Sequence, residues 1–316
     1  MNIVFIGASK LGLRCLEACT EMPEVNVIGV VTAPRTFSIS YRPSGVTNVL
    51  HADVAAFARD QHIPVAMLAG SMSDPALLDV VTVWQPDAFI VAGWYHMIPK
   101  TWRALAPAFG LHASLLPDYS GGAPLVWAII NEETKTGISF FKFADGVDNG
   151  PMVAQVDTDI LSDDTIATLY SRIEDLGFQL LVEYLPRLAN GTATLIPQDE
   201  SRRRLFPQRG PEDGKIDWTM PAHRIHNFIR AQTRPYPGAF THFRGRQITL
   251  WQSRLRQDIR SGLRSGEIGV EAGHIAVGCG EGTGLVIVLV GEGGQDINAM
   301  TWARENFIRQ HEGFCD

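Results

Sequence analysis

The 316-residue chain has few cysteines: four, at positions 15, 19, 279 and 315. Cys15 and Cys19 are four residues apart on an expected helix, but no second cysteine pair and no suitably spaced histidine pair accompanies them as zinc ligands. The sequence therefore predicts buried small side chains at these two positions and no metal site. It also favours a reducing, cytoplasmic location.

Long apolar runs and an excess of positive charge are also lacking. No run of about 18 apolar residues occurs, so we expect no membrane-spanning helix. Strand-forming residues begin at Asn2, and no signal peptide is expected before them. The net charge of −7 disfavours binding along a nucleic-acid backbone. The length is sufficient for two domains with separate cores.

Strand and helix patterns alternate through the first 190 residues, which predicts a doubly wound, Rossmann-like α/β sheet. A long Ser- and Pro-rich loop containing Arg35, Tyr41 and Arg42 is expected over residues 33–51. The expected strands are residues 2–6, 25–31, 64–67, 88–92, 136–143 and 152–156. The expected helices are residues 10–20, 52–61, 124–130 and 165–188, with a further helix after Asp74-Pro75.

The turn after the first expected strand reads Gly-Ala-Ser-Lys-Leu-Gly, over residues 7–12. It matches neither the dinucleotide-binding nor the P-loop pattern. Ser9 and Lys10 stand where a helix begins, and free backbone N–H groups there can bind a substrate phosphate. A simple N-cap role for Ser9 explains the same residue equally well.

The most informative stretch runs from Gly110 to Gly150. His112 is placed near the end of an extended segment, and Asp148 lies in a polar, glycine-punctuated loop after a later strand. A histidine that accepts a proton needs a carboxylate to orient it and to stabilise the imidazolium. The stretch therefore predicts an acid–base pair that folding brings together.

The same stretch resembles the folate-dependent formyltransferases, which include methionyl-tRNA formyltransferase, glycinamide ribonucleotide transformylase and the sugar-amine N-formyltransferases. The matching residues are 112–117, 121–124, 136–137 and 146–150, with 36 positions (148 − 112) between His112 and Asp148. The resemblance implies transfer of a formyl group from N10-formyltetrahydrofolate to a primary amine, without a metal. His112 would face the developing oxyanion or shuttle the proton, and Asp148 would orient His112.

The resemblance also implies two loops that contact the folate. The first contains His96, Met97 and Ile98, and the second contains Asp145, Gly146 and Val147. Core packing accounts equally well for Met97 and Ile98. Contacts with the amine substrate are expected, in addition, from Ser9, Lys10, Ser114, Tyr119, Gly121 and Gly122.

From Phe206 onward the chain resembles the smaller C-terminal domain of the tRNA and aminoarabinose formyltransferases, over residues 210–218, 225–231 and 235–240. Strand-like runs at 247–251, 274–278 and 285–289, separated by Gly-rich turns, suit a small OB-like β-barrel. We therefore predict a catalytic domain over 1–190, a linker over 191–205 and an OB-like domain over 206–316. The basic run Arg202–Arg204 is expected to be solvated, with a nucleotide or RNA contact as the alternative.

Two positions depart from the family pattern. Gly110 replaces an Asn that polarises the formyl oxygen, and the loss of such a donor can cost about 10² to 10³ in rate. Asn131, Asn149 or an ordered water could replace it, the acceptor could need less help, or turnover could be slow. On this basis Gly110→Asn should raise the rate or leave it unchanged. Ser120 replaces an Arg, which disfavours a tRNA substrate, as does the lysine-poor stretch over 33–51.

The motifs over residues 124–127 and 230–240 are nearest to those of the aminoarabinose-type enzyme. We therefore expect a small amine acceptor: an amino sugar on a nucleotide, or an amino-acid derivative such as hydroxyornithine. Methionyl-tRNA formyltransferase is the alternative of the same class. A folate-binding protein or a formyltetrahydrofolate hydrolase is the alternative of another class. The oligomeric state does not follow from the sequence.

Overall fold

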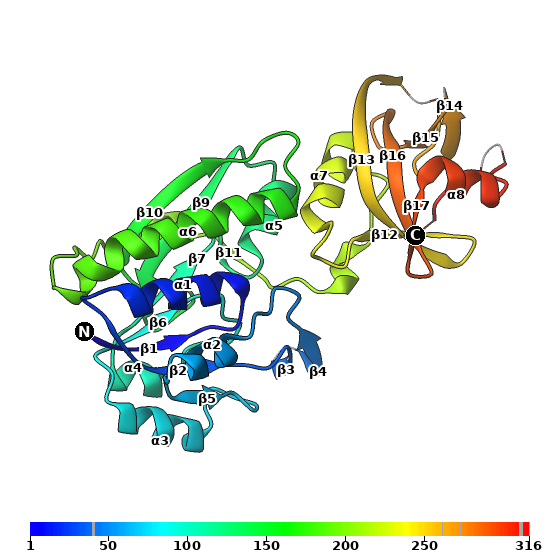
Figure 1. Cartoon of the computed structure of the whole chain (residues 1–316). Helices are drawn as coiled ribbons and strands as arrows, with labels where there is room; N and C mark the ends of the chain where they lie inside the picture. The colour runs from blue at the N-terminus through cyan, green and yellow to red at the C-terminus, as the bar shows by residue number, and fades with distance from the viewer. Residues whose placement is uncertain (40–41, 261, 272, 310–311, 316) are drawn as a thin grey trace. The chain divides into compact units, whose positions relative to one another are not determined.

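The computed structural model describes residues 1–39, 42–260, 262–271, 273–309 and 312–315 (Figure 1). The chain forms two compact units, which are described separately. The first contains residues 1–121, 136–158 and 171–205, and the second contains residues 122–135, 159–170 and 206–316. The expected boundaries of independently folding domains, at residues 190 and 206, stay a prediction.

A seven-stranded sheet forms the centre of the first unit, in the order β10–β9–β7–β6–β1–β2–β5. The pairs β1–β2, β1–β6, β2–β5 and β6–β7 are parallel, whereas β7–β9 is antiparallel. The strand order along the sheet reverses direction at β1, as in a doubly wound sheet. The strands expected from the sequence are confirmed. The bounds are β1 (Asn2–Ile6), β2 (Asn26–Thr32), β5 (Val65–Met67), β6 (Ala88–Val91), β7 (Ala108–His112), β9 (Lys135–Lys142) and β10 (Met152–Asp159).

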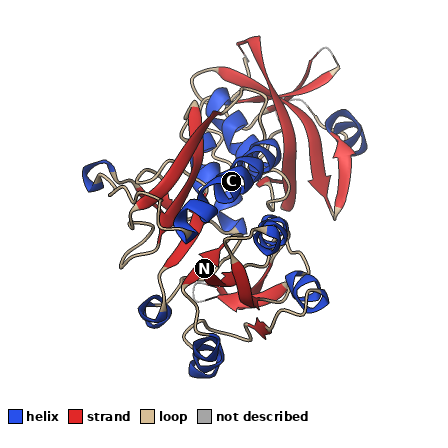
Figure 2. Ribbon diagram, turned by 60° about the vertical axis from the view of Figure 1, so that its left-hand side comes forward, coloured by secondary structure: helices blue, strands red, loops and turns tan. Residues whose placement is uncertain are grey.

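Both faces of this sheet are covered. Four successive residues of β1, from Ile3 to Ile6, have an exposed fraction of 0%, although neighbouring side chains point to opposite faces. One face packs against α3 (Pro75–Trp84) and α4 (Lys100–Leu105). Figure 1 labels these helices, with α1 (Lys10–Glu21), α2 (Val54–Asp60) and α6 (Ile166–Ala189), around the sheet, and Figure 2 draws helices in blue and strands in red.

The helices begin where their capping residues predict. Ser9 Oγ accepts a hydrogen bond from the backbone N–H of Gly12 at 3.1 Å, so the N-cap role expected for Ser9 is confirmed. Asp74 caps α3 in the same way, with Pro75 in the first helical turn. Both cysteines of α1, Cys15 and Cys19, are buried as expected.

The stretch over residues 33–51 is not a continuous loop. Strands β3 (Thr36–Ile39) and β4 (Arg42–Thr47) pair antiparallel, with Phe37 opposite Val46, so the expected irregular loop is wrong there. The frequent Ser and Pro residues outweighed the β-branched ones in the sequence pattern. At the base of the hairpin, the buried Asn48 donates to the carbonyl of Ala8 at 3.0 Å and accepts from the Tyr95 hydroxyl at 3.0 Å. The expected loop residue Tyr41 lies outside the described residues.

An antiparallel sheet dominates the second unit, in the order β12–β13–β16–β15–β14, with β17 paired to β16. The expected strands at 247–251, 274–278 and 285–289 are confirmed. Its core includes Trp302 and Phe314, whose ring centres are 5.7 Å apart. The strands are β12 (Ala239–Phe243), β13 (Arg246–Arg260), β14 (Ile268–Glu271), β15 (His274–Gly278), β16 (Thr283–Glu292) and β17 (Gln295–Asn298), and the helices are α5 (Pro124–Ile130), α7 (Ala222–Gln232) and α8 (Ala299–Glu305).

Over the described residues the pairings of this sheet do not close it into a barrel. The antiparallel sheet is therefore established, and the OB-like barrel stays a prediction. A two-stranded sheet pairs β8 (Ser120–Gly121) with β11 (Leu205–Phe206), and two 3-10 turns, η1 (Glu200–Arg202) and η2 (Pro211–Gly214), complete the elements. In the described part of the chain, no helix is long and apolar enough to cross a membrane.

Candidate active site

The structure brings the predicted pair together. His112 ends β7, and Asp148 lies in the loop between β9 and β10. His112 Nδ1 and Asp148 Oδ2 are 3.6 Å apart, and the two side chains are only 13% and 17% exposed. This distance is longer than a hydrogen bond, but catalytic hydrogen bonds are often long before substrate binds, so the two groups stay candidates for an acid–base pair.

Backbone groups of the turn before α5 bind both side chains, the imidazole of His112 and the carboxylate of Asp148. His112 Nε2 lies 2.9 Å from the carbonyl oxygen of Tyr119, and the N–H of Gly121 donates to Asp148 Oδ2 at 2.8 Å. A carbonyl oxygen can only accept, so Nε2 carries a hydrogen. In the neutral ring, Nδ1 is then the unprotonated nitrogen. It faces Asp148, and a proton that arrives at Nδ1 lies beside the carboxylate.

Arg103 of α4 joins the two loops that the resemblance assigns to the folate. Its Nε donates to the carbonyl of Ile98 at 3.2 Å, and its Nη1 lies 2.9 Å from Asp145 Oδ1. The hydrogen bond from Arg103, with the charge of Lys100, holds the pKa of the Asp145 carboxyl below its usual value. No sequence motif singled out Arg103, because its role depends on two loops that only the fold brings together.

The first of these loops has groups available for a ligand. Ile98 is 4% exposed and packs in the core, whereas Met97 is 66% exposed. Burial lowers the pKa of His96, which favours the neutral ring. His96 Nε2 and Trp94 Nε1 are buried, and neither has a hydrogen-bond partner among the described residues. Buried polar atoms left unpaired are costly, so a bound pteridine with its own donors and acceptors fits this loop.

The second loop offers an apolar side chain and a glycine turn. Val147 is 38% exposed, and Gly146 has φ +123°, which other residues rarely adopt. The amide of Asn149 donates to the carbonyl of Asp145 at 2.9 Å. Asn149 therefore shapes the turn, and its role as a replacement donor stays a prediction, as does that of the exposed Asn131 in the second unit.

Most of the residues predicted to bind the amine substrate have structural contacts of their own. Ser114 is 0% exposed, and its hydroxyl donates to the carbonyl of Asp118 at 2.7 Å. At Gly122 an added Cβ would lie 2.5 Å from the backbone of Gln208. Lys10 is exposed at the start of α1. Substrate contacts by Ser9, Lys10, Ser114, Tyr119, Gly121 and Gly122 stay a prediction.

Other atoms occupy the space that a side chain at position 110 would need. A Cβ at Gly110 would lie 2.6 Å from Cε2 of Phe143 and 3.0 Å from the carbonyl oxygen of Val91. Phe143 is itself packed against Phe141, with ring centres 4.8 Å apart. The phenylalanine ring thus fills the space that an Asn side chain would enter. The expectation that Gly110→Asn leaves the rate unchanged or raises it does not fit this packing.

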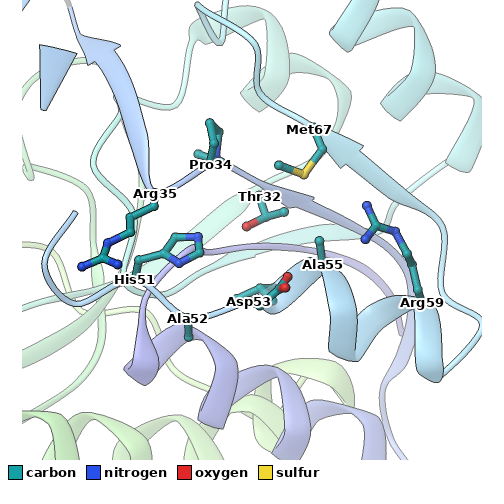
Figure 3. A pocket seen from close by; sticks show the side chains of 11 residues that line it. Thr32, Pro34, Arg35, His51, Ala52, Asp53, Ala55, Arg59 and Met67 are labelled. Atoms are coloured by element: carbon teal, nitrogen blue, oxygen red, sulfur yellow. The ribbon is translucent and has the colours of Figure 1, made fainter. Parts of the chain in front are cut away.

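A cavity of about 230 Å³ lies at the carboxyl end of β2. Figure 3 shows Thr32, His51 and Ala55 around its centre, with Arg35 and Arg59 at opposite ends. Residue 51 also forms a β-bridge with Ser9, so the cavity adjoins the turn after β1. No three His, Cys, Asp or Glu side chains come together as metal ligands in the part of the chain that the structure describes.

Comparison with known proteins gives consistent matches along the chain. Residues 1–185 match the formyl transferase family, and residues 209–306 match the formyl transferase C-terminal domain. The methionyl-tRNA formyltransferase of Koribacter versatilis (strain Ellin345) is 34% identical over 292 residues, covering 91% of this chain and 90% of that protein.

Two solved structures share the fold. The sugar 3N-formyl transferase WlaRD, crystallised in the presence of dTDP and 5-N-formyl-THF, has a TM-score of 0.67 and 16% identity over 91% of this chain and 97% of its own. HypX from Aquifex aeolicus has a TM-score of 0.63 and 15% identity over 96% of this chain. The chain spans only 49% of the length of HypX.

The family matches and the fold define a folate-dependent enzyme that transfers a one-carbon group. The chain belongs to the formyl transferase family. Members of this family transfer a formyl group, and formyl-folate is the donor.

The close approach of Phe143 to Gly110 predicts the effect of a larger side chain at position 110. Gly110→Asn should destabilise the protein by about 1–3 kcal/mol, because overpacking forces Phe143 to move, and it should lower the rate of formyl transfer. Adding Phe143→Ala should recover part of both losses. Thermal denaturation and initial rates measure them.

Gly70→Asn is the matched control, since an added Cβ at Gly70 meets nothing within 4 Å. A Gly110→Asn variant as stable as the wild type and at least as fast would contradict the steric reading.

Arg103→Ala should raise KM for formyl-folate, because it removes both the hydrogen bond to the Ile98 carbonyl and the ion pair with Asp145 that join the two loops. The kcat should change less than KM. Lys100→Ala removes the same charge, but its ammonium is 82% exposed and 3.6 Å from Asp145. Equal effects of the two variants would show that charge alone, rather than the link between the loops, is responsible.

Proposed function

We propose that the chain transfers the formyl group of N10-formyltetrahydrofolate to the primary amine of a small acceptor, an amino sugar carried on a nucleotide. The observation that carries the proposal is the proximity of His112 Nδ1 and Asp148 Oδ2, 3.6 Å apart at a half-enclosed site. The two loops joined by Arg103 supply the neighbouring surface for the folate.

The proposed chemistry is proton transfer between two side chains. The bound formyl-folate supplies the carbon that the amine nitrogen attacks. A neutral amine is required, and the proton that it loses must reach the folate nitrogen that leaves. Asp148 attracts this proton, and His112 takes it at Nδ1 and releases it from there to the leaving nitrogen, while Nε2 stays bonded to the carbonyl of Tyr119. While the proton is on His112, the positive charge of the imidazolium offsets the negative charge that develops on the formyl oxygen.

The loops around the site favour an acceptor with an extended, phosphate-bearing portion. The loops that follow β7, β6, β1 and β2 succeed one another at the carboxyl edge of the parallel strands. Three strand spacings of about 4.8 Å place the cavity after β2 roughly 14 Å from His112. Arg35 and Arg59 give that cavity two cations against the single carboxylate of Asp53, in a chain of net charge −7. A nucleotide bound there would place a linked amino sugar toward His112.

Methionyl-tRNA is the second candidate acceptor. Its support is the 34% identity, over most of both chains, to a methionyl-tRNA formyltransferase. A hydrolase that releases formate, or a folate-binding protein, is the candidate of another class, and the amine-free reaction distinguishes it. Two finer expectations belong to the same proposal: the sheet of the second unit is part of an OB-like fold, and the enzyme works in the cytoplasm.

His112→Ala and Asp148→Asn should each lower formyl transfer by about 10² to 10⁴, the usual contribution of a positioned acid or base. The amide oxygen introduced by Asp148→Asn would still accept from the N–H of Gly121, so this variant removes the charge and keeps the turn. Rates with saturating formyl-folate and amine measure the effect.

The exposed His274 and Asp60 provide the matched controls His274→Ala and Asp60→Asn, which should keep wild-type rates. Near wild-type turnover by either site variant would refute the role assigned to that residue.

The acceptor is tested with a dTDP-linked amino sugar and with methionyl-tRNA, each incubated with formyl-folate. The nucleotide sugar should be formylated and should raise the Tm, and Arg59→Ala should weaken both effects. A salt-sensitive gel shift with initiator tRNA, together with formylation of methionyl-tRNA, would favour the second candidate. Release of formate without any amine would favour the hydrolase.

A further inference from the structure

Asp148 lies in a segment that no helix or strand holds in place. Its φ of +50° is in the left-handed region, which aspartate enters at some cost. The N–H of Gly121 binds one carboxylate oxygen but does not fix the backbone. Contacts from another segment must therefore keep the carboxylate beside His112.

The side-chain amide of Gln198 binds the backbone on both sides of Asn149. Its Nε2 donates to the carbonyl oxygen of Asp148 at 2.8 Å and to that of Gly150 at 2.6 Å. Both hydrogens of the amide are thereby used. Gln198 belongs to the segment after α6 that the sequence indicated as a linker.

Arg203 fixes the orientation of this amide. Its Nη2 donates to Oε1 of Gln198 at 3.1 Å, so the amide oxygen faces the guanidinium and the nitrogen faces the two carbonyls. Its Nη1 donates to the carbonyl of Val147 at 3.0 Å and to Ser120 Oγ at 2.6 Å. Arg203 therefore contacts the residue before Asp148 and also the turn that carries Gly121.

The segment that carries the two side chains is itself anchored. Ile196 and Met152 exchange two backbone hydrogen bonds of 2.8 Å, and the N–H of Ser120 donates to the carbonyl of Arg204 at 3.0 Å. Glu200 accepts from Arg203 Nη2 at 2.8 Å, and the Arg203 side chain is only 18% exposed. At Arg203 the basic run is therefore not solvated, which corrects the expectation for this residue.

We propose that Gln198 and Arg203 are positioning residues of the formyl-transfer site, which hold Asp148 in its left-handed conformation with its carboxylate toward His112. The proposal rests on the role proposed above for Asp148. Gln198 holds the main chain at Asp148 and Gly150. Arg203 binds that amide and also the turn that supplies the N–H donor of Gly121. A single guanidinium therefore holds the loop that carries Asp148 against the turn that carries Gly121.

Kinetics test the positioning role. Gln198→Ala and Arg203→Ala should lower kcat by about 10²-fold, the effect of a small misplacement of a reacting group, with KM for both substrates changed much less. Arg202→Ala removes the same charge from an exposed neighbouring side chain and should leave kcat unchanged. In an Asp148→Asn background, Gln198→Ala should cause no further loss, because its effect passes through that carboxylate. An undiminished loss there would overturn the proposal.

Hydrogen exchange gives a readout that does not depend on activity. Gln198→Ala and Arg203→Ala should speed amide exchange over residues 144–151, and Arg203→Ala also over 119–122, whereas Arg202→Ala should not. Unchanged exchange and unchanged kcat would overturn the proposal even if the enzyme is active. Faster exchange in these variants of a protein whose wild type transfers no formyl group would uphold the positioning contacts and reject the proposed function instead.

Discussion

The contact between the His112 imidazole and the Asp148 carboxylate is the interaction on which the site depends. The two groups come from the end of a strand and from an irregular loop, and neither element alone determines their separation of 3.6 Å. The turn with Tyr119 and Gly121 bonds to one atom of each group and so acts as a common support. Because the support consists of backbone groups, side-chain changes in this turn can alter the surroundings of the pair without removing its hydrogen bonds.

Gly110 and Phe143 form one steric feature, although they are 33 positions (143 − 110) apart in the sequence. A side chain at position 110 and a large ring at position 143 compete for the same volume. The departure from the family pattern is therefore not a simple loss of one donor. The ring adds apolar surface beside β7, in the space that a side chain at position 110 would enter.

Much of the first unit could be predicted from its sequence, because alternating apolar strands and capped helices are local patterns. His112 and Asp148 were found because they lie in a long motif. Gln198 was missed because it binds backbone carbonyls of a loop distant in sequence, and a carbonyl leaves no signature in the residue types. Arg103 was missed because its carboxylate partner, Asp145, is 42 positions (145 − 103) away. Ser120 illustrates the same limit: the arginine that the resemblance expects there is absent, yet the guanidinium of Arg203 lies against the serine hydroxyl.

The β3–β4 hairpin is attached to the loop after β6 through its base and through Phe37, whose ring centre lies 5.0 Å from that of His96. Asn48 ties that base to the turn after β1 and, through Tyr95, to the loop after β6. A change at Asn48 would consequently disturb two neighbouring loops together, and a change at Phe37 would disturb the loop that carries His96. Substitutions in this hairpin would thus reach the loop expected to contact the folate indirectly, through Phe37 and Asn48.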